Sequence, residues 1–187
     1  METSIIISGF GGQGALFAGQ LLAYAGMDVG KHVTWIPSYG PEMRGGTAHC
    51  TVIISDDPIG TPIVAEPQVV IALNQPSYEK YEPIVQPGGT FVVNSSLVND
   101  RSSRKDVDVV YVPASTIAEA HGSIKMLNMA AIGALLARHL FLPITAVEDA
   151  LENHLPKSKK HLLEANFQVL HGGLRAATVL NNESVYA

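Results

Sequence analysis

Two short segments of this chain carry residue types from which a ligand site is readily built. The first is the run Gly9-Phe10-Gly11-Gly12-Gln13-Gly14, which follows an apolar stretch and precedes an alanine- and leucine-rich one. Glycines at the first, third and sixth positions of such a turn let the backbone bend sharply and leave no Cβ in the way of a ligand. The following helix directs unpaired N–H groups and its positive dipole end at the loop, which favours phosphate.

The glycine run lacks the features of two common nucleotide sites. A dinucleotide site carries an acidic residue about 20 residues beyond the motif, at the end of the second strand. The candidate strand here ends in Pro37-Ser38-Tyr39, and Asp28 stands before it rather than after it. No Gly-Lys-Ser or Gly-Lys-Thr closes the run, so it is not a P-loop. The glycines therefore either contact a ligand other than NAD or form only a tight turn between strand and helix.

The second segment, residues 38–47, reads Ser-Tyr-Gly-Pro-Glu-Met-Arg-Gly-Gly-Thr and holds more than a connecting turn requires. Arg44 offers a planar array of donors suited to phosphate or carboxylate. Alternatively, Arg44 pairs with Glu42 and braces its own loop. In a doubly wound sheet, the carboxyl end of the second strand lies beside the loop after the first strand. We therefore expect both segments to face one crevice.

The elements that must position these segments follow from the pattern of apolar residues. Continuous Ile/Val runs without polar alternation are typical of strands that are buried on both faces. The predicted strands are Ser4–Ser8, Val33–Ile36, Ala48–Ser55, Val69–Leu73, Thr90–Asn94 and Val107–Val112. We expect one α/β domain over residues 1–187, with three layers and a mostly parallel, Rossmann-like twisted sheet.

Helical patterns lie between and after these strands. They are predicted over 15–25, from 75, from 116, over 123–140, from 145 and over 158–179. Thr116 with Glu119, and Thr145 with Glu148, have the spacing of a capping box. Gly172-Gly173 should weaken the last helix. The first helix is apolar nearly all round, with small residues on one stripe, which suggests cover from another chain.

Composition narrows the function classes. The chain has 12 basic and 17 acidic residues and a net charge of −5, which argues against a nucleic-acid-binding surface. Its single cysteine, Cys50, excludes an internal disulfide or a cysteine-ligated cluster within this chain, and its apolar setting predicts a buried thiol. The seven histidines show no paired ligand spacing and Gly-x-Ser-x-Gly is absent, so we predict no metal ligands and no catalytic residues.

No apolar stretch is long enough to cross a bilayer, and no leader-like segment precedes the first strand. We therefore expect a cytoplasmic protein that does not bind a membrane.

Together, the two segments resemble the gamma subunit of 2-oxoacid:ferredoxin oxidoreductases. The resemblance continues through Pro58-Ile59, the strand Val69–Leu73, Pro87-Gly88-Gly89 and Asn128-Met129, so it covers most of the chain. Pyruvate-type subunits resemble Gly-Pro-Glu-Arg-Arg-Gly in the second segment, and indolepyruvate types resemble Gly-Met-Ser-Gln-Arg-Gly-Gly. The Gly-Pro-Glu-Met-Arg-Gly-Gly found here over 40–46 is most similar to the 2-oxoglutarate and 2-oxoisovalerate types.

The resemblance implies a subunit of a complex that converts a 2-oxoacid and coenzyme A to acyl-CoA, CO2 and reduced ferredoxin. Thiamine diphosphate, magnesium and iron–sulfur clusters are then expected on partner subunits, which are thiamine-binding and ferredoxin-like. Ferredoxin would be the electron acceptor of the complex. This chain alone is expected to be inactive and to bind no cofactor by itself, with coenzyme A at a shared site.

We expect the crevice between the two segments to close one side of that shared site and to help place coenzyme A. The candidate contacts are Gly9, Gly11, Gly12, Gln13, Gly14, Ser38, Tyr39, Glu42, Arg44, Gly45, Gly46 and Asn128. Asn128 is expected in the middle of an apolar helix, where its amide either bonds a loop or ligand near the crevice or is satisfied within the core. The cluster Lys157, Lys159 and Lys160 either reaches a phosphate or an acidic partner or forms a solvated helix start.

Two other functions remain alternatives. One is the small subunit of an indolepyruvate oxidoreductase, which Tyr39-Gly40-Pro41-Glu42 disfavours. The other is a free-standing nucleotide-binding enzyme or sensor, which the missing carboxylate after the second strand and the unusually apolar helices disfavour.

Overall fold

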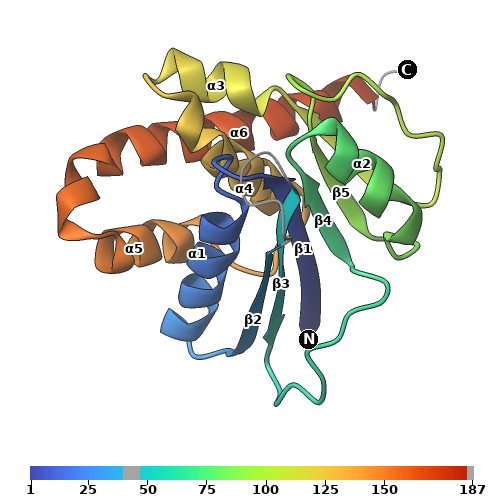
Figure 1. Ribbon diagram of the computed structural model, residues 1–187, viewed down its shortest axis with the longest axis horizontal. Coiled ribbons are helices and arrows are strands. Elements are labelled where there is room, and N and C mark those ends of the chain that lie inside the picture. The colour runs from blue at the N-terminus through green and yellow to red at the C-terminus, as the bar shows by residue number, and fades with distance from the viewer. Residues whose placement is uncertain (40–46, 185–187) are drawn as a thin grey trace.

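A six-stranded sheet forms the centre of the computed structural model, which describes residues 1–39 and 47–184 (Figure 1). The strand order is β2-β3-β1-β4-β5-β6. The strands are β1 (Glu2–Phe10), β2 (His32–Tyr39), β3 (Thr47–Ser55), β4 (Val69–Ala72), β5 (Thr90–Asn94) and β6 (Asp108–Val112). Each coincides with a strand predicted from the sequence, within a few residues at the ends.

The sheet is mixed but mostly parallel, as predicted. Strands β1, β4, β5 and β6 run parallel to one another, whereas β3 runs antiparallel to both β1 and β2. The first three strands depart from a doubly wound order, because the antiparallel β3 lies between β1 and β2. Strands β2 and β3 end and begin at Tyr39 and Thr47, and a connection this short can join only antiparallel neighbours.

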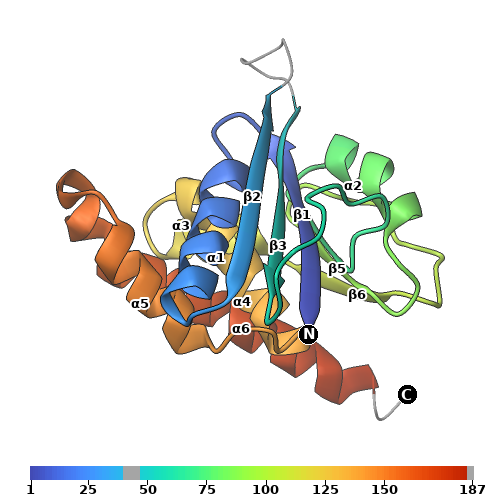
Figure 2. The same ribbon diagram turned by 90° about the horizontal axis from the view of Figure 1, so that it is seen from below.

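The helices cover the two faces of this sheet unequally. They are α1 (Ala15–Asp28), α2 (Gln75–Tyr81), α3 (Ala114–Ala120), α4 (Leu127–Arg138), α5 (Ile144–His154) and α6 (Leu163–Ser184). Short 3-10 turns span Glu82–Ile84, Ile124–Met126 and Lys157–Leu162. Figure 2 shows α1, α4, α5 and α6 on one side of the strands and α2 on the other, which gives three layers.

Several predicted helix boundaries are wrong. The predicted capping boxes do not form, because Pro113 and Pro143 occupy the N-cap positions and the two threonines lie inside α3 and α5. A proline has a fixed φ angle and lacks an N–H, so it suits a helix start. The predicted helix over 123–140 is a 3-10 turn followed by α4, and the one over 158–179 is a 3-10 turn followed by α6.

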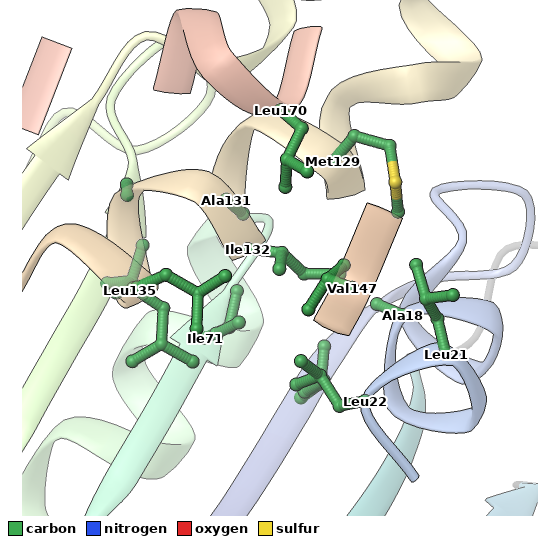
Figure 3. Close-up of a cluster of buried hydrophobic side chains, with 14 of the residues drawn as sticks. Ala18, Leu21, Leu22, Ile71, Met129, Ala131, Ile132, Leu135, Val147 and Leu170 are labelled. Carbon is green, nitrogen blue, oxygen red and sulfur yellow. The ribbon is translucent and has the colours of Figure 1, made fainter. Parts of the chain in front are cut away.

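The larger core lies between the sheet and the helices of the crowded face. Figure 3 shows Leu22 of α1, Ile71 of β4, Ile132 of α4, Val147 of α5 and Leu170 of α6 directed into this cluster, and all are almost completely buried. On the opposite face, a smaller core forms where α2 covers β1, β4 and β5. Its buried residues include Ile6, Val70, Tyr78, Tyr81, Phe91 and Val93.

Glycines allow the closest helix packing in this core. A Cβ on Gly133 of α4 would overlap the carbonyl oxygen of Leu170, and one on Gly173 of α6 would overlap that of Ala130. The expected weakening of the last helix at Gly172-Gly173 is not visible as a break, since α6 continues through both residues. Close contact between α4 and α6 compensates for the lower helix propensity of glycine there.

The predicted buried thiol is confirmed. Cys50 is inaccessible to solvent and lies against α1, where a Cβ on Gly19 would overlap its Sγ. Burial raises the pKa of this thiol to about 11. The small-residue stripe of α1 therefore serves close packing on β3.

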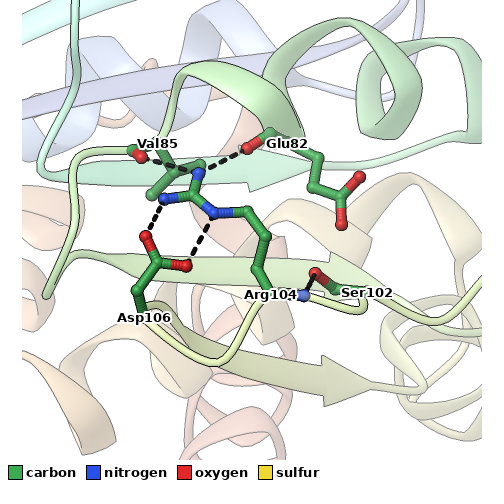
Figure 4. A network of polar contacts seen from close by, with 5 residues as sticks. All are labelled: Glu82, Val85, Ser102, Arg104 and Asp106. Atoms are coloured by element: carbon green, nitrogen blue, oxygen red, sulfur yellow. Dashed lines mark hydrogen bonds and ion pairs between the residues drawn. The ribbon is translucent and has the colours of Figure 1, made fainter.

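A polar cluster at the edge of the smaller core fastens the connection between β5 and β6 (Figure 4). The guanidinium of Arg104 donates to both carboxylate oxygens of Asp106 at 3.0 and 2.5 Å. It also donates to the carbonyl oxygens of Glu82 at 2.9 Å and Val85 at 2.7 Å. One side chain thereby ties this connection to the segment that follows α2.

Candidate functional site

The glycine loop, residues 9–14, leaves β1 at the edge of the sheet where the β2–β3 hairpin also ends. Gly9 pairs with Ala48 of β3, and Tyr39 of β2 pairs with the same residue. The second predicted segment therefore begins and ends at the same edge as the glycine loop. Glu42, Arg44, Gly45 and Gly46 lie outside the described residues, so their predicted contacts stay predictions. Ser38 is half-buried on β2 and is paired with His49.

The glycines of the loop are required for different structural reasons. Gly12 and Gly14 have φ angles of 98° and 78°, in the left-handed region that other residues rarely adopt. A Cβ on Gly14 would also lie 2.7 Å from Nδ2 of Asn128, and one on Gly9 would lie 2.8 Å from Oε1 of Gln13. Gly11 and Gly12 are exposed. The loop thus combines a sharp turn with close approach of two side-chain amides.

The side chain of Gln13, predicted as a ligand contact, folds back onto the protein. Its Oε1 accepts hydrogen bonds from the Phe10 N–H at 2.7 Å and from Nδ2 of Asn74 at 3.0 Å. Its Nε2 donates to the carbonyl oxygen of Leu73 at 3.4 Å. The backbone N–H of Gln13 also donates to the Phe10 carbonyl, which closes the turn. Gln13 therefore holds the loop in shape.

Asn74 was missed in the sequence, although it is central to this arrangement. It is 2% exposed, and its Oδ1 accepts from the Ser77 N–H at 3.0 Å as the N-cap of α2. Ser77 Oγ in turn lies 2.9 Å from Ser8 Oγ of β1. The sequence signal was the pair Asn74-Gln75 before Pro76, a helix-start pattern, but nothing local indicates that the amide of Asn74 reaches Gln13.

A second buried amide continues this polar network along the ends of the parallel strands. Nδ2 of Asn94, at the end of β5, donates to the Leu73 carbonyl at 3.2 Å and to Ser115 Oγ at 3.1 Å. The Leu73 carbonyl thus accepts from both Gln13 and Asn94. The carboxyl ends of β1, β4 and β5 and the starts of α2 and α3 are linked by one set of hydrogen bonds.

Asn128 holds the other side of the loop. It lies in the first turn of α4 rather than mid-helix, and its Nδ2 donates to the Gly14 carbonyl at 3.2 Å. Its Oδ1 accepts from the Met129 N–H at 3.1 Å. Of the two alternatives for this amide, hydrogen bonding to a loop is the one observed. The glycine loop is thereby fixed to the start of α4.

A pocket of about 420 Å³ opens beside the loop. It lies between the glycine loop, the start of α4 and the segment that leads into α6. The lining residues are Gly12, Gly14, Phe17, Ser123, Lys125, Met126, Asn128, Leu155, Lys159, Leu162 and Asn166. Two lysines and no carboxylate are among these residues of the described part of the chain, so this lining attracts anions although the chain carries a net charge of −5.

The loop adds hydrogen-bond donors to this positive surface. The N–H groups of Gly11, Gly12 and Gly14 make no hydrogen bond with any residue that the structure describes. The first turn of α1 has no side-chain cap and no acidic residue within those described ranges. The positive end of the α1 dipole is thus available to an anion at the loop.

Among the polar side chains that line the pocket, Asn166 and Lys125 were not predicted from the sequence, whereas Lys159 was. Asn166 is 7% exposed, and its Nδ2 donates to the Leu162 carbonyl at 2.7 Å. Its Oδ1 accepts a hydrogen bond from none of the described residues, and Asn166 is one of the residues that line the pocket. Lys125 was not predicted. Of the predicted lysine cluster, Lys159 lines the pocket, whereas Lys160 donates to the Glu152 carbonyl.

Within residues 1–39 and 47–184, no group of three or more His, Cys, Asp or Glu residues is arranged to hold a metal ion. No helix in this part of the chain is long and apolar enough to span a bilayer.

Comparisons with known proteins agree with this architecture. Residues 4–176 match the family model described as pyruvate ferredoxin/flavodoxin oxidoreductase. The ketoisovalerate oxidoreductase subunit VorA of Methanothermobacter marburgensis is 37% identical over 177 residues, which are 92% of this chain and 36% of the relative. This chain therefore spans about a third of the length of that relative. The 2-oxoglutarate synthase subunit KorC of Methanocaldococcus jannaschii is 34% identical over 168 residues, which are 87% of this chain and 90% of that relative.

A solved structure shares the fold across nearly its whole length. The gamma subunit of a keto/oxoacid ferredoxin oxidoreductase from Geobacter sulfurreducens superposes with a TM-score of 0.83 and 29% sequence identity. The superposition covers 96% of this chain and 98% of that one.

Proposed function

The chain belongs to the pyruvate ferredoxin/flavodoxin oxidoreductase family, and from that premise we propose that it is the gamma-type component of a 2-oxoacid:ferredoxin oxidoreductase. The complex converts a 2-oxoacid and coenzyme A to acyl-CoA, CO2 and reduced ferredoxin. Thiamine diphosphate and iron–sulfur clusters on partner subunits supply the decarboxylation and electron transfer. This chain contributes a surface that binds coenzyme A and orients its thiol toward the partner's site.

The observation that carries this role is the positive pocket beside the glycine loop. Coenzyme A carries a diphosphate and a 3′-phosphate, and such groups bind to free backbone N–H groups at a helix start and to lysine ammonium groups. Lys125 and Lys159 stand at this pocket with no carboxylate among its lining residues. A pocket of about 420 Å³ accommodates part of a ligand of this size.

The buried amide of Asn166 favours a ligand that is more than a simple phosphate. Its Oδ1 is not used by any described residue, so it is free to accept a hydrogen bond from a ligand hydroxyl or N–H in the pocket that Asn166 lines. Coenzyme A offers both kinds of donor in its ribose and pantetheine parts. A site built only for inorganic anions would gain nothing from an acceptor oxygen in its lining.

The segment over 40–46 is proposed to complete the site from the β2–β3 hairpin. Its flanking residues Tyr39 and Thr47 lie at the sheet edge where the glycine loop begins, as their pairing with Ala48 and Phe10 indicates. Arg44 would then provide a further cation for the ligand, and closure over the bound thiol would exclude water from the reactive adduct.

The substrate is proposed to be 2-oxoglutarate or a branched-chain 2-oxoacid. Relatives named for each of these activities match most of this chain at similar identity. Screening 2-oxoacids with the assembled complex, by coenzyme A-dependent dye reduction, separates the two. Turnover of an aryl pyruvate in preference to both would favour the indolepyruvate alternative instead.

The coenzyme A role is tested by Lys125→Ala and Lys159→Ala in the assembled complex. Each change should raise the KM for coenzyme A about threefold to fivefold, as loss of a solvent-exposed charge pair does, and leave the KM for the 2-oxoacid unchanged. Lys157→Ala is the matched control, because Lys157 belongs to the same 3-10 turn but does not line the pocket. An unchanged KM for coenzyme A in both pocket variants would contradict the proposal.

A further inference from the structure

The shape of the glycine loop depends on which way the Gln13 amide is turned. Its oxygen lies between two donors, the Phe10 N–H and Nδ2 of Asn74, and its nitrogen faces the Leu73 carbonyl. Rotation of the amide by half a turn would place Nε2 against both donors and Oε1 against a carbonyl oxygen. The Gln13 amide therefore supports the turn only in this orientation, which a partner outside the loop must fix.

Asn74 is the outside partner whose orientation is itself determined. Its Oδ1 accepts from the Ser77 N–H as the cap of α2, so its Nδ2 must point away from α2 and toward Gln13. Helix α2 is in turn anchored by the Ser77–Ser8 hydrogen bond and by the buried rings of Tyr78 and Tyr81. Because Asn74 is 2% exposed, water does not replace these bonds.

We propose that Asn74 is a positioning residue for the ligand site: through Gln13 it maintains the turn that leaves the N–H groups of Gly11 and Gly12 exposed for binding. Asn74 does not line the pocket beside the loop. This inference rests on the proposed binding of coenzyme A at the loop. Asn74 affects ligand binding only through the Gln13 amide and the backbone that this amide holds.

The first test is Asn74→Asp in the assembled complex. Aspartate caps a helix as well as asparagine does, so the bond to the Ser77 N–H is kept. The donor to Gln13 is replaced by a carboxylate oxygen, which repels Oε1. The KM for coenzyme A should rise at least fivefold relative to the parent at pH 8. This ratio should fall as the pH is lowered, because a protonated carboxyl again donates a hydrogen bond to Oε1.

Asn74→Ser is a second variant without a buried charge. Serine also caps the helix but is too short to reach Gln13, so the KM for coenzyme A should again rise while the KM for the 2-oxoacid is unchanged. In a Gln13→Ala background, Asn74→Ser should add nothing further, because both changes remove the same contact. Ser77→Ala is the control for loss of α2 stability, since it removes the bond to Ser8 but keeps Asn74 on Gln13.

The outcomes separate the two proposals. If the Lys125 and Lys159 variants raise the KM for coenzyme A but neither Asn74 variant does, the positioning role is overturned and the binding role stands. If Asn74→Ser raises the KM for both substrates equally, or multiplies the effect of Gln13→Ala, Asn74 acts by general stability and the positioning role is overturned. If no lysine or Asn74 variant changes the KM for coenzyme A, the proposed function itself fails.

Discussion

The carboxamide of Asn128 donates a hydrogen bond of 3.2 Å to the carbonyl oxygen of Gly14, a residue 114 positions earlier in the chain. A Cβ on Gly14 would lie only 2.7 Å from the nitrogen of the same amide. The start of α4 is therefore packed directly against the turn of the glycine loop. A side chain at position 14 would disturb both.

Gly14→Ala should consequently destabilise the protein more than Gly12→Ala. Both residues have positive φ angles, so each alanine introduces left-handed strain of about 1–2 kcal/mol. Only the Cβ at position 14 meets a neighbour, since nothing lies within 4 Å of a Cβ at Gly12. Urea denaturation of the two variants measures the difference, which should shrink when Asn128→Ala is also present. Equal losses in both variants would contradict the contact.

The adjacent residues Gly172 and Gly173 of α6 allow a second comparison of two glycine-to-alanine variants. Gly173→Ala should lower the free energy of unfolding by about 2–4 kcal/mol, because its Cβ would overlap backbone of α4, which cannot move aside. Gly172→Ala places its Cβ 2.7 Å from the end of the Ile117 side chain, which can rotate, and it gains helix propensity of about 1 kcal/mol. Thermal unfolding should show a large loss for position 173 and little change for position 172.

Arg104→Ala should loosen the connection between β5 and β6. The change leaves the carbonyl oxygens of Glu82 and Val85 without their donor, which costs about 1–2 kcal/mol of stability. Arg104→Lys should recover only part of this loss, because one ammonium cannot satisfy a carboxylate and two carbonyls in separate directions. Hydrogen exchange at residues 95–107 should increase in both variants. Full recovery by lysine would show that charge alone matters here.

The Arg104–Asp106 pair should also give stability a pH dependence. Hydrogen bonding to Arg104 holds the pKa of Asp106 below its ordinary value near 3.8. A carboxyl with a lowered pKa in the folded state contributes stability above its unfolded pKa and loses it as the pH falls through the folded pKa. Between about pH 5 and about pH 2, the melting temperature of the parent should therefore fall more steeply than that of Asp106→Asn. Parallel curves would exclude this contribution.

Cys50 should be unreactive in the folded protein. Its thiol is inaccessible to solvent, and burial raises its pKa to about 11, so almost no thiolate is present at pH 8. Mass spectrometry after treatment with iodoacetamide should find no adduct under native conditions and one adduct in denaturant. Rapid labelling of the native protein would show that α1 separates from β3 readily.

Most of the secondary structure could be predicted from local pattern. Several of the six strands follow from continuous Ile/Val runs, and the turn after β1 follows from glycines whose conformations other residues rarely adopt. The combination of that turn with residues 38–47 also indicated the family, which the match over residues 4–176 confirms. These features depend on residues close together in the chain, so their signal is present before folding.

The strand order and the roles of the site residues required the folded chain. Nothing in the local sequence places β3 between β2 and β1, because pairing depends on the length and geometry of a connection rather than on the strands themselves. Gln13 and Asn128 were predicted as ligand contacts, yet their amides hold the loop by bonding Asn74, Leu73 and Gly14. Their partners are set by how the helices pack on the sheet.

The pocket likewise combines residues that the sequence identified with residues that only the folded chain brings together. Its glycines were identified from their spacing, whereas Lys125, Lys159 and Asn166 come from three other segments that only the folded chain brings together. A sequence pattern reports what each residue prefers over a few neighbours. The charge of a pocket and the orientation of a buried amide depend on atoms more than a hundred residues away, and only tertiary packing brings those together.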